Sequence, residues 1–124
     1  MDESVWVVLS TWPDAERARA AASLVVQEGL AACGNLVPGV ESIYRWKGTV
    51  ETAQEILVIF KTTARCYPAL EKRLRTLHPY EVPEIVAFPP KAGLPAYMDW
   101  VRDSCAPEVT LTKPRSSMSS ARAS

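Results

Sequence analysis

The 124-residue chain has one histidine, no excess of either charge and no long apolar run. Lys and Arg together number 14, as do Asp and Glu, so the formal net charge is zero. Binding to DNA or RNA relies on basic side chains that neutralise phosphates, so we expect no nucleic acid among its partners. A membrane-spanning helix needs about 20 mostly apolar residues in succession. Because no such run occurs, we expect no membrane partner either.

Cysteine is also scarce. The three cysteines are Cys33, Cys66 and Cys105, and no pair has the Cys-x-x-Cys spacing. Their odd number argues against a framework of disulfides, which uses cysteines in pairs. The first residues, Met1-Asp2-Glu3, are acidic, whereas a secretory signal begins with a basic region. These features predict a reduced chain in the cytoplasm.

The segment from His78 to Glu84, His-Pro-Tyr-Glu-Val-Pro-Glu, gathers the only imidazole, a phenol and two carboxylates. Pro79 disfavours a helical conformation at His78, so a preceding helix ends there, and Pro83 restricts the residue before it in the same way. The segment is therefore stiff. It either presents these groups for a function, as loops on rigid scaffolds often do, or it only connects a helix to a strand.

Hydrophobic periodicity and turn signals predict seven elements in the order strand, helix, strand, strand, helix, strand, helix. Their expected ranges are 5–12, 13–28, 33–46, 49–63, 64–77, 84–88 and 93–104. This order is the split βαβ pattern of the α+β ferredoxin-like fold, with an extra C-terminal helix. Right-handed crossovers place the first two helices on one face of the sheet.

The domain is expected to occupy residues 1–105. Residues 106–124 are rich in serine, with two prolines and almost no apolar residues, which predicts a disordered C-terminal tail.

Within the domain, the strands joined at Lys47-Gly48 are unusually long, so the hairpin would overhang and need another subunit to cover it. Tyr44 and Trp46 share one face of this hairpin. They either stack a ligand or, as we favour, anchor a subunit interface.

Several short motifs occur in order along residues 5–104. They are Leu30-Ala31-Ala32-Cys33; Gly39, Ser42, Tyr44, Trp46 and Gly48; Glu51 and Glu55; Lys61-Thr62-Thr63; His78-Pro79-Tyr80 with Pro83-Glu84; and Gly93, Tyr97 and Trp100. With these motifs the chain resembles the CutA family of divalent-cation tolerance proteins. The resemblance implies a ferredoxin-like protomer and a homotrimer similar in architecture to the PII signalling proteins. It also implies binding of divalent cations and a link to copper tolerance.

This chain has fewer of the metal ligands that the resemblance implies. Family members with the best case for a copper site carry a cysteine and a second histidine where Ser10 and Leu77 stand here. His78 and Cys33 are the remaining candidates, and imidazole and thiolate both suit copper. His78 could instead donate to a ligand or be hydrogen-bonded at a helix end, and Cys33 could be a small buried hydrophobe. We expect that no cofactor is required and that copper or another divalent cation is the candidate ligand.

Lys61 follows an apolar strand, where its charge needs a carboxylate or a bound anion. We expect an inter-subunit pocket, or else a structural ion-pair network, lined by Glu55, Lys61, His78, Tyr80, Glu84 and Trp100.

The chain lacks a Ser-His-Asp order, a Gly-rich phosphate loop and a metal-hydrolase helix, which predicts that it is not an enzyme. The expected function is divalent-cation tolerance through metal binding. The alternative is a PII-like sensor that binds a small anionic ligand between subunits.

Overall fold

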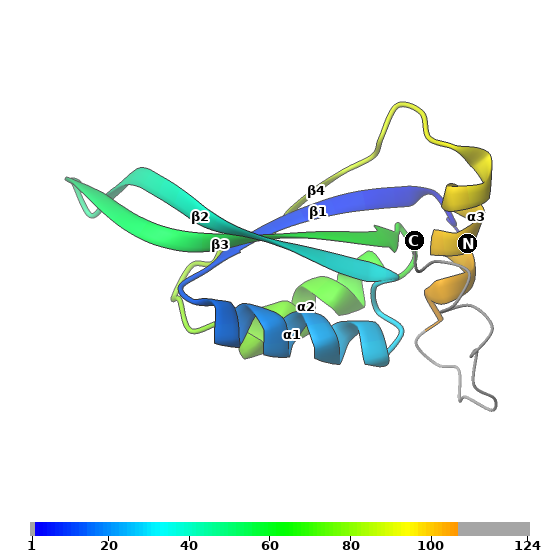
Figure 1. Ribbon diagram of the computed structural model, residues 1–124, viewed down its shortest axis with the longest axis horizontal. Coiled ribbons are helices and arrows are strands. Elements are labelled where there is room, and N and C mark those ends of the chain that lie inside the picture. Colours follow the sequence, from blue (N-terminus) through cyan, green and yellow to red (C-terminus); the bar gives the residue numbers. More distant parts are fainter. Residues whose placement is uncertain (1, 107–124) are drawn as a thin grey trace.

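In the computed structural model, which describes residues 2–106, four strands form one antiparallel sheet with two helices packed on it (Figure 1). The strand order is β2-β3-β1-β4, so β1 lies between β3 and β4 and pairs with both. The α+β ferredoxin-like fold is thereby confirmed. The strands are β1 (Val5–Trp12), β2 (Cys33–Trp46), β3 (Thr49–Thr63) and β4 (Val86–Phe88). The predicted tail, apart from residue 106, lies outside the described residues.

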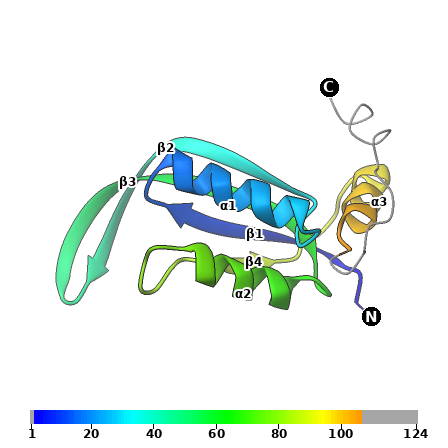
Figure 2. The ribbon, with the colours of Figure 1, turned by 90° about the horizontal axis from the view of Figure 1, so that it is seen from below.

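Helices α1 (Ala15–Gln27) and α2 (Tyr67–Leu77) lie side by side on one face of the sheet (Figure 2). Asp14 caps α1 by accepting the amide of Arg17 at 2.8 Å. Helix α3 (Pro95–Ser104) lies at the end of the sheet, near the N-terminus of the chain (Figure 1). The prolines that open α2 and α3 sit in the first turn, where a missing N–H costs nothing. None of the helices within residues 2–106 is long and apolar enough to cross a membrane.

The main core fills the space between the sheet and the two helices. Small side chains let α1 approach the sheet closely, because a Cβ on Gly34 would lie only 3.1 Å from the Phe60 ring and 3.3 Å from Ala22. A second buried cluster lies under α3. The main core contains Val8, Trp12, Ala18, Ala21, Ala22, Val25, Leu30, Ala31, Val58, Phe60, Leu70 and Leu74. The second contains Val5, Ala32, Cys66, Val101 and Cys105.

The β2–β3 hairpin extends well beyond the body of the domain (Figure 1). Its turn has positive φ at Lys47 (52°) and Gly48 (82°), as a two-residue hairpin turn with matching twist requires. A bulge interrupts β2 between Val37 and Val40, with Gly39 at φ 76°. The predicted long hairpin, its turn and its break are therefore confirmed.

The sheet face opposite α1 and α2 is apolar. Since Val8 and Phe60 point into the core, their neighbours along β1 and β3, such as Leu9 and Ile59, point to the other face. The side chains that share this face are Val7, Leu9, Val37, Leu57, Ile59, Val86 and Phe88, and all are half-buried or exposed. Among the helices within residues 2–106, only α3 packs on this side, at one end.

Candidate functional site

His78 lies where α2 ends and the stiff loop begins. Its backbone is extended (φ −82°, ψ 137°), as the following proline requires, while its amide still donates to the Leu74 carbonyl at 3.0 Å. Nε2 of the imidazole lies 2.7 Å from the carbonyl oxygen of Thr11, and the amide of Tyr80 donates to Nδ1 at 3.2 Å. A carbonyl only accepts, so Nε2 carries a proton. Because Nδ1 accepts the Tyr80 amide, it carries none, and the ring is neutral.

Two aromatic rings contact the imidazole. The His78 ring stacks on Trp12 with centroids 4.0 Å apart, and the centroid of the Tyr80 ring lies 4.7 Å from that of His78. Burial lowers the pKa of His78, against the opposing effects of the Thr11 carbonyl and the Glu55 carboxylate. Of the three roles left open by the sequence, the structure shows a histidine hydrogen-bonded at a helix end. A metal would have to displace one of these hydrogen bonds to bind either nitrogen.

The stability of the protein should therefore fall below about pH 6.5, the ordinary pKa of histidine. The unfolded chain binds the proton first there, while the folded chain resists it, so acid favours unfolding. Each pH unit between the unfolded and folded pKa costs about 1.4 kcal/mol of the free energy of unfolding. Urea melts from pH 7 to 5 test this, with His78→Gln as the control that cannot titrate. Equal slopes in both proteins would contradict the assignment.

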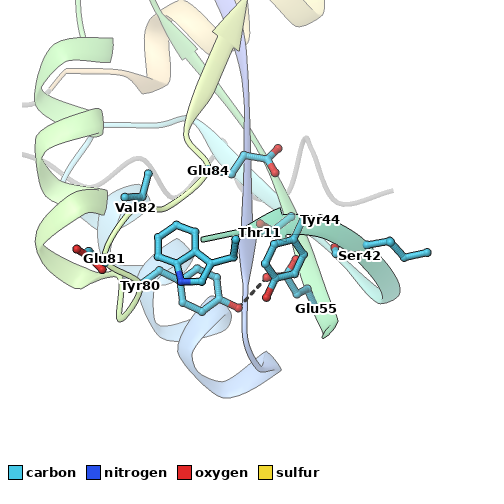
Figure 3. Close-up of a pocket in the computed structure, with 10 residues that line it drawn as sticks. Thr11, Ser42, Tyr44, Glu55, Tyr80, Glu81, Val82 and Glu84 are labelled. Carbon is cyan, nitrogen blue, oxygen red and sulfur yellow. Dashed lines mark hydrogen bonds between the residues drawn. The ribbon is translucent and has the colours of Figure 1, made fainter. Parts of the chain in front are cut away.

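A pocket of about 560 Å³ opens beside this loop (Figure 3). Its walls come from three segments that are distant in sequence: the hairpin, the end of β1 and the loop between α2 and β4. Its lining residues are Thr11, Ser42, Ile43, Tyr44, Trp46, Glu55, Tyr80, Glu81, Val82 and Glu84.

The pocket is acidic and aromatic. Glu55, Glu81 and Glu84 line it, and no Lys or Arg of the described part of the chain does so. The Tyr80 hydroxyl donates to Oε2 of Glu55 at 2.7 Å (Figure 3). Burial, together with this carboxylate, raises the pKa of Tyr80, so the phenol keeps its proton and holds Glu55 in place. Carboxylate oxygens and aromatic faces suit a cationic ligand.

The single chain unites some of the predicted pocket residues. Glu55, Tyr80 and Glu84 line the pocket, and His78 does not line it but contacts the Tyr80 ring. Lys61 and Trp100 lie elsewhere: Lys61 donates to the Asn35 side chain, and Trp100 on α3 stacks with Tyr97. The predicted six-residue pocket is therefore not assembled by one chain, and its completion by a neighbour stays a prediction.

Cys33 and His78 lie too far apart to share a metal ion within one chain. Cys33 aligns through Lys61 with Val7 of β1, whereas His78 binds Thr11, four residues further along that strand. Four residues of strand span roughly 13 Å. The Cys33 thiol instead lies 3.7 Å from the Tyr97 hydroxyl. Among residues 2–106, no three His, Cys, Asp or Glu side chains are close enough to hold a metal ion by themselves.

Tyr44 and Trp46, predicted to lie at a subunit interface, also line the pocket. They are 44% and 38% exposed, so both keep surface that a neighbour can cover. The sequence reasoning missed Thr11 and Ser42 as lining residues. The two-residue strand period already placed Ser42 on the face of Tyr44 and Trp46, but nothing in the sequence brought Thr11 to the loop.

Comparison with known proteins agrees with this architecture. The family model described as CutA1 divalent ion tolerance protein matches residues 6–104. The divalent-cation tolerance protein CutA of Thermus thermophilus is 52% identical over 98 residues, covering 79% of this chain and 95% of that protein. Mouse protein CutA is 44% identical over 98 residues, which cover 79% of this chain and 55% of the mouse protein. The chain thus spans about half the length of its mammalian relatives.

Solved structures of such proteins superpose closely. The divalent cation tolerance protein of Thermus thermophilus has a TM-score of 0.80 at 50% identity, covering 82% of this chain and 99% of that one. CutA from Xylella fastidiosa has a TM-score of 0.81 at 42% identity, covering 83% and 99%. With the fold and the sequence in agreement over almost all described residues, the chain belongs to the CutA1 divalent ion tolerance family.

Proposed function

We propose that this protein contributes to divalent-cation tolerance in the cytoplasm, without catalysis, by binding divalent cations, copper among them, in the acidic pocket. The observation that carries the proposal is a pocket with Glu55, Glu81 and Glu84 in its walls and no basic residue of residues 2–106 among its lining. His78 is the nearest nitrogen ligand. Its Nδ1 can bind copper only if the 3.2 Å hydrogen bond from the Tyr80 amide is broken. The expected affinity for copper is therefore weak. Cys33 lies outside this site.

The proposal includes assembly of the chain into a homotrimer. The apolar sheet face and the projecting hairpin, where Ile43 is 68% exposed and Val50 59%, are surfaces that a second subunit stabilises by covering. The three carboxylates of one chain are too dispersed to enclose a metal ion alone. The hairpin forms one wall of the pocket, so a subunit that covers the hairpin also borders the pocket. In a closed ring each neighbour can therefore supply the remaining ligands.

The alternative is a sensor for a small anion between subunits. It is favoured by Lys61, which lies on the open face of the sheet, where an assembled neighbour would cover it. The acidic pocket itself repels anions, so this ligand would have to bind near Lys61.

Replacing Glu84 by glutamine should weaken copper(II) binding at least tenfold, because it removes one charged ligand without changing the shape of the side chain. Glu55→Gln should do the same. Equilibrium dialysis or calorimetry measures the affinity. The matched control is Glu16→Gln, which removes an equal charge from the exposed surface of α1 and should leave binding unchanged.

The two candidate functions separate in this experiment. If Glu55→Gln and Glu84→Gln bind copper as the wild type does, the acidic pocket is not the site. A rise in melting temperature with phosphate that Lys61→Met abolishes, together with no response to copper, would favour the anion sensor instead.

A further inference from the structure

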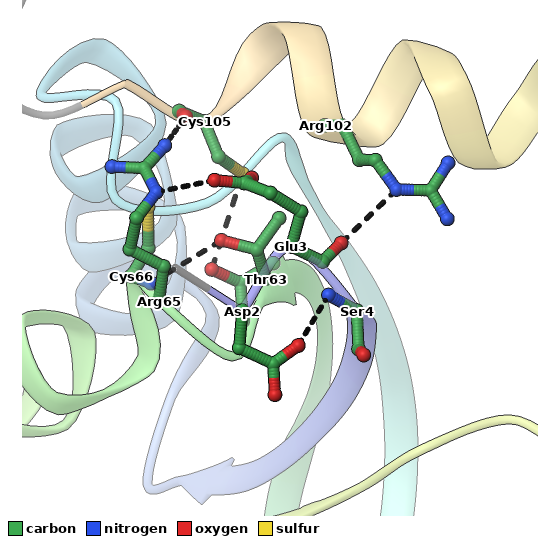
Figure 4. Close-up of polar contacts among 9 residues, drawn as sticks. Asp2, Glu3, Ser4, Thr63, Arg65, Cys66, Arg102 and Cys105 are labelled. Carbon is green, nitrogen blue, oxygen red and sulfur yellow. Dashed lines mark hydrogen bonds and ion pairs between the residues drawn. The ribbon is translucent and has the colours of Figure 1, made fainter.

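Two thiols meet beneath α3. Cys66 precedes the first turn of α2 and Cys105 follows the last turn of α3, and both belong to the buried cluster at that end of the sheet. Each is only 1% exposed, and both are free thiols. Figure 4 shows them in one group with Arg65, Glu3 and Thr63. Neither lies in the acidic pocket.

The surrounding hydrogen bonds fix this arrangement. The Cys66 amide donates to Oγ1 of Thr63 at 3.2 Å, and the Cys105 thiol donates to Oγ1 of Thr62 at 3.9 Å. Each cysteine is therefore hydrogen-bonded to the C-terminal end of β3, Cys66 through its amide and Cys105 through its thiol. Arg65 makes a third hydrogen bond in this group, because its Nη2 donates to the Cys105 carbonyl at 3.2 Å. The residue next to Cys66 thus holds the backbone of Cys105.

The two thiols differ in acidity. Contact with the Cys105 thiol is the largest cause that lowers the pKa of Cys66, and the hydroxyl of Thr63 and the charge of Arg65 lower it further. Its place at the start of a helix favours a thiolate as well. The same contact, together with burial, raises the pKa of Cys105. Cys66 lies at the N-terminus of a helix, which stabilises a thiolate, and Cys105 lies at the C-terminus of one, which does not. Cys66 is therefore the nucleophile of the pair, and Cys105 is the thiol that reacts second.

We infer that Cys66 and Cys105 form a redox-active dithiol that hydroperoxides oxidise to an intramolecular disulfide. The Cys66 thiolate attacks one peroxide oxygen and breaks the O–O bond, which gives a sulfenic acid and, with a proton, water. The Cys105 sulfur then loses its proton, attacks the Cys66 sulfur and expels hydroxide, which leaves as a second water. Two thiols and one hydrogen peroxide thus become one disulfide and two waters, and a dithiol reductant reverses the change.

The disulfide links the start of α2 to the end of α3. It closes a loop of about 40 residues, which raises stability by restricting the unfolded chain. We expect the melting temperature to rise on the order of 10 °C. It also holds α3, and with it Tyr97, over Cys33, whose thiol lies 3.7 Å from the Tyr97 hydroxyl.

Peptide mapping tests the inference on the full chain. Trypsin cuts after Arg45, Lys72 and Arg102, so the three cysteines fall on separate peptides. After brief treatment with hydrogen peroxide, alkylation under denaturing conditions and digestion without reductant, a cross-linked pair of the Cys66 and Cys105 peptides should appear. The intact mass should fall by about two hydrogens, and dithiothreitol should restore both alkylation sites.

Variants provide the controls. Cys33→Ser leaves the pair untouched and should form the same cross-link with the same rise in melting temperature. Cys66→Ser should leave Cys105 alkylatable after peroxide, and no change in melting temperature should follow oxidation. Three results with oxidised wild-type protein would overturn the inference. The first is alkylation of all three cysteines, and the second is a cross-link that includes Cys33. The third is oxidation of Cys66 to a sulfinic acid while Cys105 remains alkylatable. These last readouts use wild-type protein, so they do not depend on the folding of any variant.

Discussion

Trp12→Ala should lower the free energy of unfolding by about 3–5 kcal/mol, the usual cost of truncating a buried tryptophan. Trp12 is fully buried in the main core at the end of β1. It also forms the wall on which the His78 ring stacks, at 4.0 Å. The substitution therefore leaves a cavity and releases the residue that positions Tyr80, so the pocket should lose its order together with the core.

Urea denaturation at pH 7 measures the loss in stability, and copper titration measures the loss of the pocket. The control is Trp6→Ala, on the same strand and the same face, where the ring is only half-buried and contacts Tyr67 at 5.5 Å. Its cost should be clearly smaller, and copper binding should be retained. If both variants lose stability equally, Trp12 has no special role under the loop.

Ile59→Asp should convert the assembled protein into monomers. Ile59 lies at the centre of the open sheet face, between Leu9 and Asn35. In the isolated chain this face contacts water, so a carboxylate is tolerated. In a trimer that buries the face, three unpaired carboxylates would lose their hydration, which costs far more than the lost apolar contact.

Light scattering at micromolar concentration gives the mass, with Val26→Asp as the control. Val26 is 36% exposed on α1, away from the open face, so its substitution should leave the mass unchanged. We expect the wild type at three times the chain mass of 13.7 kDa. A wild-type monomer would contradict the trimer, and a trimer that survives Ile59→Asp would place the interface on another surface.

The elements with local causes were predictable from the sequence. Alternating apolar residues, the Lys47-Gly48 turn and Pro79 each restrict their own backbone or that of a neighbour, so the order of elements and the end of α2 agree with prediction. Boundaries shifted where a local signal was weak: α2 begins at Tyr67 instead of 64, and β4 at Val86 instead of 84. The start of β4 depends on where it can pair with β1, and the start of α2 depends on how the helix packs on the sheet.

The sequence by itself determined the fold class, the long hairpin and the acidic, aromatic character of the loop from His78 to Glu84. Only the tertiary structure decided how those groups are used. It engaged both nitrogens of His78 within the chain, separated Cys33 from it, and brought Cys66 to Cys105. The reason is physical: a residue type and its neighbours limit the backbone, but the partner of a side chain is set by which distant surfaces pack together.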